Sequence, residues 1–326
     1  MIRKILVIIL NSILNNNFVL RYQIRSIKNI NFDNFDFLNL SFENHEELKN
    51  ILFSKQYFSK KFYDEKSMNY HTFAWLNSAK KIGGAKIISI SKQHIINWYK
   101  KKYNSSSSVW DEIIISKRLL NLIYNYDFYA TSATEKEKNI FKFVILKNYF
   151  VLKLKAVFLK DIHEQPIEIF KTLLLLHSIN NLKVDKIVTQ INNQINYQVN
   201  KSGLHKSINP STQAEFINEL YEIKNICLYF KISIPKTVEN HIINMSSVLK
   251  NLFHKDNTIA LFNGSNNANY NQLIKINNLF KDIKPKNLSE EKDGLVVFEF
   301  KKIKIFFDVT IPTSKLLSHN LHSGTL

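Results

Sequence analysis

Apolar residues recur at intervals of three and four positions through most of residues 70–284. In the clearest run, after Pro210, one apolar residue falls on nearly every helical turn: Phe216, Leu220, Ile223, Cys227 and Phe230. That spacing puts the side chains on one face of a helix, and such a face is normally buried against a neighbour. The segment is predicted to form roughly seven to nine helices with short connections, so that consecutive helices pack antiparallel.

Local signals mark where some of these helices are expected to begin. Ser132-Ala-Thr-Glu135 and Thr212-Gln-Ala-Glu215 both have the pattern of a capping box, in which the side chains of the first and fourth residues satisfy free backbone N–H groups. Pro235 suits the first turn of another helix, because proline has no N–H to leave unpaired there.

The periodicity changes from three or four to two near the end of the chain. Apolar Ile303, Ile305, Phe307 and Val309 alternate with Lys304, Phe306 and Asp308, which is typical of a strand, and Lys301-Lys302 is expected near a turn or bulge between this strand and the one before it. The apolar face of the strand either packs on the helices or stays exposed and prone to aggregation.

Helices followed by strands predict an α+β chain that is mostly α. We expect three parts: an irregular leader over residues 1–68, a helical domain over 69–285, and the first strands of a β-domain over 286–326.

The composition supports a folded and strongly basic protein. Of the 326 residues, 45% are hydrophobic and 13% aromatic, which is enough for a sizeable core. The single cysteine, Cys227, excludes an internal disulfide and a cysteine-based zinc site. The net charge of +18 has two explanations: a polyanionic partner, or a compositional drift toward Asn, Lys, Ile, Phe and Tyr that has spread lysines along the chain.

The N-terminus, MIRKILVIIL, has the basic start and apolar run of a signal peptide, but the run is short, asparagines follow it and no small-residue cleavage site is evident. It is also too short to span a bilayer, so a buried or surface helix is favoured. The sequence does not choose between the bacterial cytoplasm and the periplasm or cell envelope as the compartment.

Five stretches carry a resemblance to a known family. They are Tyr70-His-Thr-Phe-Ala-Trp-Leu-Asn77, with a Phe-x-Trp-Leu pattern; Trp110 through Arg118, with tryptophan and arginine eight positions apart; Gln198-Val-Asn-Lys-Ser-Gly-Leu-His-Lys-Ser-Ile-Asn-Pro-Ser211; Phe253-His-Lys-Asp-Asn-Thr-Ile-Ala-Leu-Phe-Asn-Gly-Ser265; and His322-Ser-Gly-Thr-Leu326. In order and spacing they resemble the bacterial heparinase II/III-like polysaccharide lyases, in the compact alphaproteobacterial form. The resemblance implies an (α/α) toroid of antiparallel helices, followed by an antiparallel β-sandwich, with a carbohydrate cleft between them.

The resemblance also implies β-elimination on uronic-acid polysaccharides such as glycosaminoglycans. This reaction needs a group that neutralises the substrate carboxylate, a base for the weakly acidic α-proton and an acid for the leaving oxygen. By residue match His205 is the neutralising group, and His254 and His322 are further catalytic candidates. Asn209 and Asn263 are the candidate substrate-binding residues, the catalytic tyrosine (Tyr197 or Tyr270) cannot be chosen, and no cofactor or metal is implied.

The motif around His205 departs from the family pattern at three positions. Ser202 stands where the family has Asp, Leu204 where it has a second Gly, and Ile208 where an Arg is expected. The exchange at Leu204 disfavours a positive φ, and the loss of the Asp removes a charge that can orient a neighbour.

Two further hypotheses follow from the same residues. The chain is either a non-catalytic, truncated remnant that binds acidic glycans, or a basic helical protein that binds nucleic acid, although no RNP-type motif or DNA-reading helix-turn-helix is recognisable. His94, His163, His177 and His241 have no acidic or cysteine partners at metal-ligand spacing and are interpreted as packing or surface residues.

The resemblance expects the β-sandwich to continue for many strands beyond Leu326. The chain is therefore predicted to be C-terminally incomplete, with a small sheet remnant, a loose tail after Pro312 and His322 mobile or distant from His205, so that it lacks full lyase activity.

Overall fold

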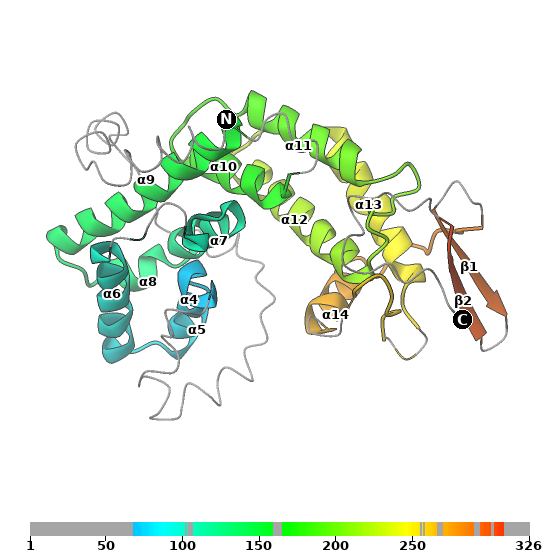
Figure 1. The fold of residues 1–326 in the computed structure, drawn as a ribbon, viewed down its shortest axis with the longest axis horizontal. Coiled ribbons are helices and arrows are strands. Elements are labelled where there is room, and N and C mark those ends of the chain that lie inside the picture. The colour runs from blue at the N-terminus through cyan, green and yellow to red at the C-terminus, as the bar shows by residue number, and fades with distance from the viewer. Residues whose placement is uncertain are drawn as a thin grey trace. The chain divides into compact units, whose positions relative to one another are not determined.

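Eleven α-helices, one short 3-10 helix and one antiparallel hairpin make up the part of the chain that the computed structural model describes (Figure 1). The described residues are 68–101, 103, 107–158, 165–254, 256, 258–265, 270–289, 294–300 and 303–309. The predicted class, α+β and mostly α, is confirmed. The arrangement of the helices as a toroid stays a prediction. The predicted tail after Pro312 lies outside the described residues, as does the predicted leader apart from its last residue, Met68.

The chain forms two compact units, which are described separately. The first unit comprises residues 1–39 and 44–187, and the second comprises residues 40–43 and 188–326. The border between them falls inside helix α11 (Asp185–Gln198).

The helices of the first unit pack around α7. They are α4 (Met68–Thr72), α5 (Trp75–Ile82), α6 (Ala85–Lys100), the 3-10 helix η3 (Ser108–Trp110), α7 (Glu112–Tyr124), α8 (Tyr126–Ala130), α9 (Glu135–Phe158) and α10 (Ile167–Ile179). α7 contacts α4, α9, α10 and η3, and its Ile115, Leu119 and Leu122 are fully buried. The helices outnumber the prediction in part because α5 is separate from α4, where Phe73 has a φ of 57°.

Arg118 of α7 is fully buried in this core. Its Nε donates to Asn148 Oδ1 at 2.9 Å, its Nη1 to the carbonyl of His71 at 2.8 Å and its Nη2 to the carbonyl of Val109 at 3.0 Å. Hydrogen bonds to neutral oxygens therefore replace the ion pair that a buried charge usually needs.

Aromatic rings complete the surroundings of this arginine. The Arg118 guanidinium lies 4.6 Å from the ring centroid of Trp98 and 5.4 Å from that of Trp110, within the range of cation–π interactions. Phe73 contacts Trp75 and Trp98 edge-on at 5.7 and 5.5 Å. The Phe-x-Trp-Leu and Trp-to-Arg patterns in the sequence are thus parts of one aromatic core.

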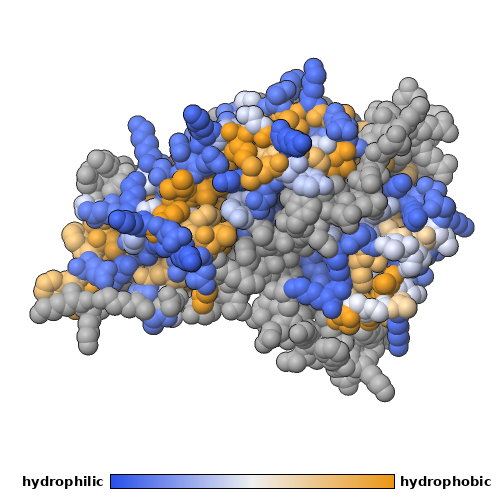
Figure 2. All heavy atoms as spheres, turned by 180° about the vertical axis from the view of Figure 1, so that it is seen from behind, coloured by the Kyte–Doolittle hydropathy of each residue, from blue (hydrophilic) through white to orange (hydrophobic). Residues whose placement is uncertain are grey.

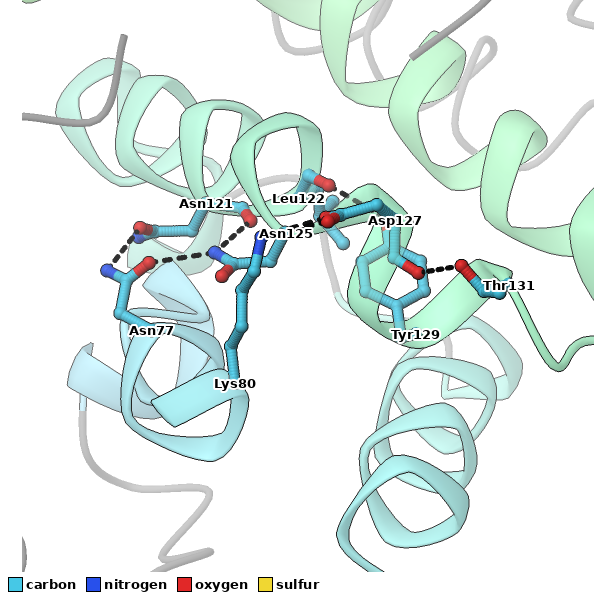
Figure 3. Close-up of polar contacts among 8 residues, drawn as sticks. All are labelled: Asn77, Lys80, Asn121, Leu122, Asn125, Asp127, Tyr129 and Thr131. Carbon is cyan, nitrogen blue, oxygen red and sulfur yellow. Dashed lines mark hydrogen bonds and ion pairs between the residues drawn. The ribbon is translucent and has the colours of Figure 1, made fainter. Parts of the chain in front are cut away.

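An amide network joins α5 to α7 and α8 (Figure 3). Asn77 Nδ2 donates to Asn121 Oδ1 at 3.0 Å, and Asn125 Nδ2 donates to Asn77 Oδ1 at 2.8 Å. Lys80, one turn further along α5, forms an ion pair with Asp127 at 2.9 Å. The amides bind one another and the backbone, so this polar cluster fixes the helix packing.

The capping of α9 differs from the prediction by two residues. Thr134 is the residue before the helix, its backbone N donates to the Glu137 carboxylate at 2.8 Å, and the N–H of Glu137 donates to Thr134 Oγ1 at 3.3 Å. The box is therefore Thr134 to Glu137 and not Ser132 to Glu135. Both stretches contain the same pattern of residue types, and the local sequence alone does not choose between them.

The second unit contains most of α11, together with α12 (Pro210–Tyr229), α13 (Lys236–Asn251), α14 (Tyr270–Leu279) and the hairpin of β1 (Leu295–Phe300) and β2 (Ile303–Asp308). α12 packs on α13, and α14 contacts both (Figure 1). Four residues of the predicted apolar face of α12 are buried, namely Phe216, Leu220, Ile223 and Cys227. The fifth, Phe230, follows the last helical residue and is half-buried.

The hairpin has one apolar face, and that face is exposed. Val296 pairs with Phe307, Phe298 with Ile305, and Phe300 with Ile303. Residues directly opposite each other in an antiparallel pair project on the same side, so all six share one face. Five of them are exposed to solvent, and only Val296 is buried. The apolar face of β2 is therefore exposed and does not pack on the helices, which were the two alternatives left open by the sequence.

The other face of β2 packs on the second unit. Lys304 Nζ donates to the carbonyl of Phe253 at 3.0 Å, and the rings of Phe306 and Phe262 lie 5.7 Å apart. The hairpin therefore belongs to the same compact unit as α12–α14, and the border between the two units falls at 187/188. The domain boundary near 285 stays a prediction.

Two general findings limit the chemistry of the described residues. None of the helices in these ranges is both long and apolar enough to cross a membrane. No three His, Cys, Asp or Glu side chains within the same ranges gather where they could hold a metal ion.

Candidate functional site

The loop between α11 and α12 carries the motif around His205, and backbone hydrogen bonds close it on itself. Val199 and His205 form an isolated antiparallel bridge, and the N–H of Lys206 donates to the carbonyl of Gln198 at 2.8 Å. The amide oxygen of Asn200 accepts from the N–H of Leu204 at 2.9 Å and from the Ser202 hydroxyl at 2.6 Å.

Gln213 of α12 attaches this loop to the helices. Its Oε1 accepts from the N–H of His205 at 2.7 Å, and its Nε2 donates to the carbonyls of Gly203 at 2.8 Å and Met245 at 3.0 Å. The side chain of Gln213 is fully buried. One glutamine thus holds α12, α13 and the loop together.

Gly203 is needed where the loop meets α13. Its φ is +94°, and a Cβ at this position would lie 2.8 Å from the carbonyl carbon of Asn244. Leu204, at the position of the second family glycine, has no positive φ and is buried, so the exchange predicted to be unfavourable does not strain the backbone. The strained non-glycine residue is Ile208, with a φ of 49°.

His205 is buried, with 4% of its surface exposed, and its ring lies 5.3 Å from that of Phe216. The N–H of Ser207 donates to His205 Nδ1 at 3.1 Å, so in the neutral ring Nδ1 is the acceptor and the proton sits on Nε2. Burial, and then the charge of Lys206, lower the pKa of His205 to about 4. At neutral pH the ring is an uncharged hydrogen-bond donor.

A chain of polar contacts runs from His205 to the hairpin. The Ser207 hydroxyl lies 2.8 Å from His205 Nδ1 and accepts from the N–H of Asn209 at 3.3 Å. Asn209 Nδ2 donates to the carbonyl of Asn263 at 2.8 Å, and Asn263 Nδ2 donates to Asp308 Oδ2 at 3.1 Å. The structure thus connects three of the predicted site residues, His205, Asn209 and Asn263.

Asn209 also caps α12, because its Oδ1 accepts from the N–H of Thr212 at 3.0 Å and Pro210 occupies the first helical turn. The capping box predicted to begin at Thr212 is therefore wrong: the cap lies three residues earlier. Both ends of the Asn209 amide are used within the protein, which favours a structural role for this residue.

His254 lies on the hairpin side of this chain of contacts, beside a group of partly exposed side chains. Its ring meets that of Phe306 edge-on at 5.9 Å, and Lys304 Nζ lies 5.9 Å from the centroid of the same Phe306 ring. Phe262 packs on Phe306, and its neighbour Asn263 contacts Asp308. We call His254, Phe262, Asn263, Lys304 and Phe306 the Phe306 cluster.

Sequence reasoning found part of this group. His254 and Asn263 were predicted site residues, whereas Lys304, Phe306 and Phe262 were missed. The signal that could have found Lys304 and Phe306 is the strand face that they share, opposite the apolar face of Ile303, Ile305 and Phe307.

Other predicted residues lie apart from the Phe306 cluster or outside the described residues. His322 and the side chain of Tyr270 belong to the latter group. Tyr197 carries Lys206 Nζ 4.3 Å from its ring centroid. Neither tyrosine is thereby assigned to catalysis.

Comparisons with known proteins give this site no relative: no family model, no curated protein and no solved structure matches the chain.

Proposed function

We propose that the second unit binds acidic, uronic-acid-containing glycans at the Phe306 cluster. The observation that carries the proposal is the arrangement around one ring: Phe306 lies between His254, Phe262 and Lys304. An apolar ring face suits the C–H face of a sugar, and a few polar groups placed around it fix orientation.

The polar members of the cluster suit an anionic sugar. Lys304 supplies a positive charge that can pair with a uronate carboxylate, and His254 supplies ring nitrogens that hydrogen-bond oxygen atoms. The amide of Asn263 is held by Asp308, which fixes its direction. The net charge of +18 adds a general attraction for polyanions.

Calorimetric titration with heparin-derived and other uronic-acid oligosaccharides tests this proposal. Lys304→Gln removes the charge from the cluster, and we expect it to weaken binding about five- to tenfold, in line with the loss of one charge-assisted hydrogen bond. Phe306→Ala should weaken it at least as much. Circular dichroism of each variant checks that the helices remain.

The matched control is Lys236→Gln, which removes the same charge from the first residue of α13. A helix of 16 residues is about 24 Å long, so Lys236 lies far from the loop that follows the other end of α13. Equal weakening by the two lysine variants would show that only net charge matters and would contradict the proposed site. Tighter binding of single-stranded RNA or duplex DNA at the same salt would favour the nucleic-acid alternative.

Turnover by β-elimination is a second candidate function, and the state of His205 favours it. A neutral ring with its proton on Nε2 can donate a hydrogen bond to a substrate carboxylate, as the neutralising group of a lyase must. The ultraviolet absorbance of the unsaturated product measures turnover. His205→Gln should abolish it and His241→Gln, on the exposed side of α13, should not. Glycan binding without product would leave the protein a binding module.

A further inference from the structure

The core of the first unit contains more hydrogen-bond donors than acceptors around Arg118. A guanidinium group has five N–H donors. Within the part of the chain that the structure describes, three of them are used, by the oxygens of Asn148, His71 and Val109. Two N–H groups of the Nη atoms therefore remain on a side chain that is 0% exposed.

Two neighbouring rings add further donors. The indole Nε1 of Trp110 and the hydroxyl of Tyr103 are buried, and neither has a hydrogen-bond partner among the described residues. Trp110 is 3% exposed, and its ring centroid lies 5.4 Å from the Arg118 guanidinium. The rings of Tyr103 and Trp110 both contact Trp98, at 5.5 and 6.0 Å between centroids. We call Trp98, Tyr103, Trp110 and Arg118 the Arg118 cluster. Buried donors without partners destabilise a fold, so an acceptor within the cluster would stabilise this one.

The charge of the Arg118 cluster at neutral pH is positive. Burial lowers the pKa of Arg118 to about 9, so the guanidinium stays protonated. Burial raises the pKa of Tyr103 to about 12, so its hydroxyl stays neutral and can donate. Lys147 Nζ lies 5.7 Å from the ring centroid of Trp110, and Lys101 Nζ lies 5.7 Å from that of Tyr103. These charges favour an acceptor that is itself negatively charged.

We propose that the Arg118 cluster binds one chloride ion. The ion accepts hydrogen bonds from the Nη groups of Arg118, the Trp110 indole and the Tyr103 hydroxyl, and its charge compensates that of the guanidinium. A monovalent ion balances one buried positive charge, whereas sulfate or phosphate brings a second charge and several oxygens that need donors of their own. Tyr103 is half-buried, so the ion reaches the cluster from the side of this residue.

Bromide tests this proposal, because it has the charge of chloride and nearly its size, and it quenches tryptophan fluorescence on contact. The chain's three tryptophans all belong to the first unit and are at most 6% exposed, so bromide in the solvent reaches them poorly. We expect bromide to cause a saturable loss of emission in the millimolar range. Chloride should restore the emission by displacing bromide. Sodium gluconate keeps the ionic strength constant, and its anion is too large for the cluster.

Binding at the cluster has to be distinguished from the general attraction of anions to the protein surface. Hydrophilic side chains are spread widely over the face of the molecule that Figure 2 shows, and the net charge of +18 attracts any anion. That attraction is not specific for one halide and is screened as the ionic strength rises. A loss of emission that grows linearly with bromide, without recovery on addition of chloride, would overturn the proposal.

A variant of Tyr103 tests the cluster itself. Tyr103→Phe removes one donor and keeps every tryptophan, so it should weaken bromide binding about tenfold, the effect of losing one hydrogen bond to a charged group. The matched control is Tyr149→Phe, which removes another buried hydroxyl of the same unit that has no partner among the described residues. The ring of Tyr149 contacts Phe150 and His177. This control should bind bromide like the unchanged protein, and equal affinities for all three proteins would contradict the proposed site.

Stability gives a second measurement that does not depend on quenching. Because the ion binds the folded chain, chloride should raise the urea midpoint of the tryptophan signal above its value in gluconate at the same ionic strength. Trp110→Phe removes the indole N–H and keeps a ring, and it should reduce this difference, as should Tyr103→Phe. Tyr149→Phe should leave it unchanged. Equal midpoints in the two salts for the unchanged protein, or the same chloride effect in all variants, would overturn the proposal.

Discussion

Arg118 shows how a single residue can determine a core. Its guanidinium is buried against Trp98 and Trp110, and it donates three hydrogen bonds to neutral oxygens. A charge in this setting is stabilised by its hydrogen bonds and by the rings together, so the loss of either partner leaves buried groups unsatisfied.

We expect Arg118→Ala to lower the free energy of unfolding by about 3 to 5 kcal/mol, because it leaves a cavity and three unpaired oxygens. Urea denaturation followed by tryptophan fluorescence measures the change. Lys117→Ala removes the same charge from the exposed neighbouring position and should change the stability by less than about 0.5 kcal/mol. Similar effects from the two variants would contradict the role assigned to the buried guanidinium.

His205 should make the protein less stable in acid. The pKa of His205 is about 4 in the folded chain, below the ordinary value of 6.5. Between these two pH values the His205 ring is therefore protonated in the unfolded chain but not in the folded chain. The stabilisation is complete above pH 6.5 and is lost as the pH falls toward 4. The full difference is worth about 3 kcal/mol. Urea midpoints measured from pH 7.5 to 4 follow it.

His205→Asn isolates this contribution, because its amide oxygen can still accept from the N–H of Ser207 but does not titrate. The variant should lose less stability than the unchanged protein between pH 6.5 and 4. His241→Asn alters a partly exposed histidine of the same unit and should leave the pH profile as it was. Parallel profiles for all three proteins would show that His205 does not titrate as described.

At the scale of elements, the helices follow from the sequence more directly than the strands. The apolar spacing in α12 predicted its buried face, because a helix face needs only one partner surface. The strand pattern predicted β2 but not which face packs inward. Phe306 and Lys304 lie inward because Phe262 and the carbonyl of Phe253 are their partners, and these belong to a loop far away in sequence.

The candidate site was predictable in part for the same reason. His254 and Asn263 stand in a recognisable stretch, whereas the contacts that join Asn263 to Asp308 and Asn209 to Asn263 are tertiary. The hydrogen bonds that bury His205 depend on Gln213, a residue that no motif marked. The sequence identified candidate residues, but it did not identify the residues that contact them in the folded chain.

The contact between the His205 loop and α13 gives a prediction at this scale. Gly203→Ala should destabilise the protein by more than about 2 kcal/mol, because it combines a positive φ with a clash against Asn244. Gly84→Ala is the control: its φ is +89°, but nothing lies within 4 Å of the added Cβ. It should cost about 1 kcal/mol. Chemical denaturation compares them, and equal costs would exclude the close approach as a cause.

At the scale of the whole molecule, the two units have separate cores that are joined through α11. Leu119 of the first unit and Leu220 of the second are both fully buried. The chain's three tryptophans, Trp75, Trp98 and Trp110, all belong to the first unit. Tryptophan fluorescence therefore reports on the first unit, while circular dichroism reports on the helices of both.

We predict that the two signals do not coincide during urea unfolding, as they would for a single two-state transition. Leu220→Ala should destabilise the second unit by about 2 to 5 kcal/mol, because it creates a cavity. It should shift the dichroism curve and leave the fluorescence midpoint in place. Leu119→Ala, the matched truncation in the first unit, should lower the fluorescence midpoint. If each variant shifted both midpoints together, the two units would unfold as one cooperative structure, and the prediction would be wrong.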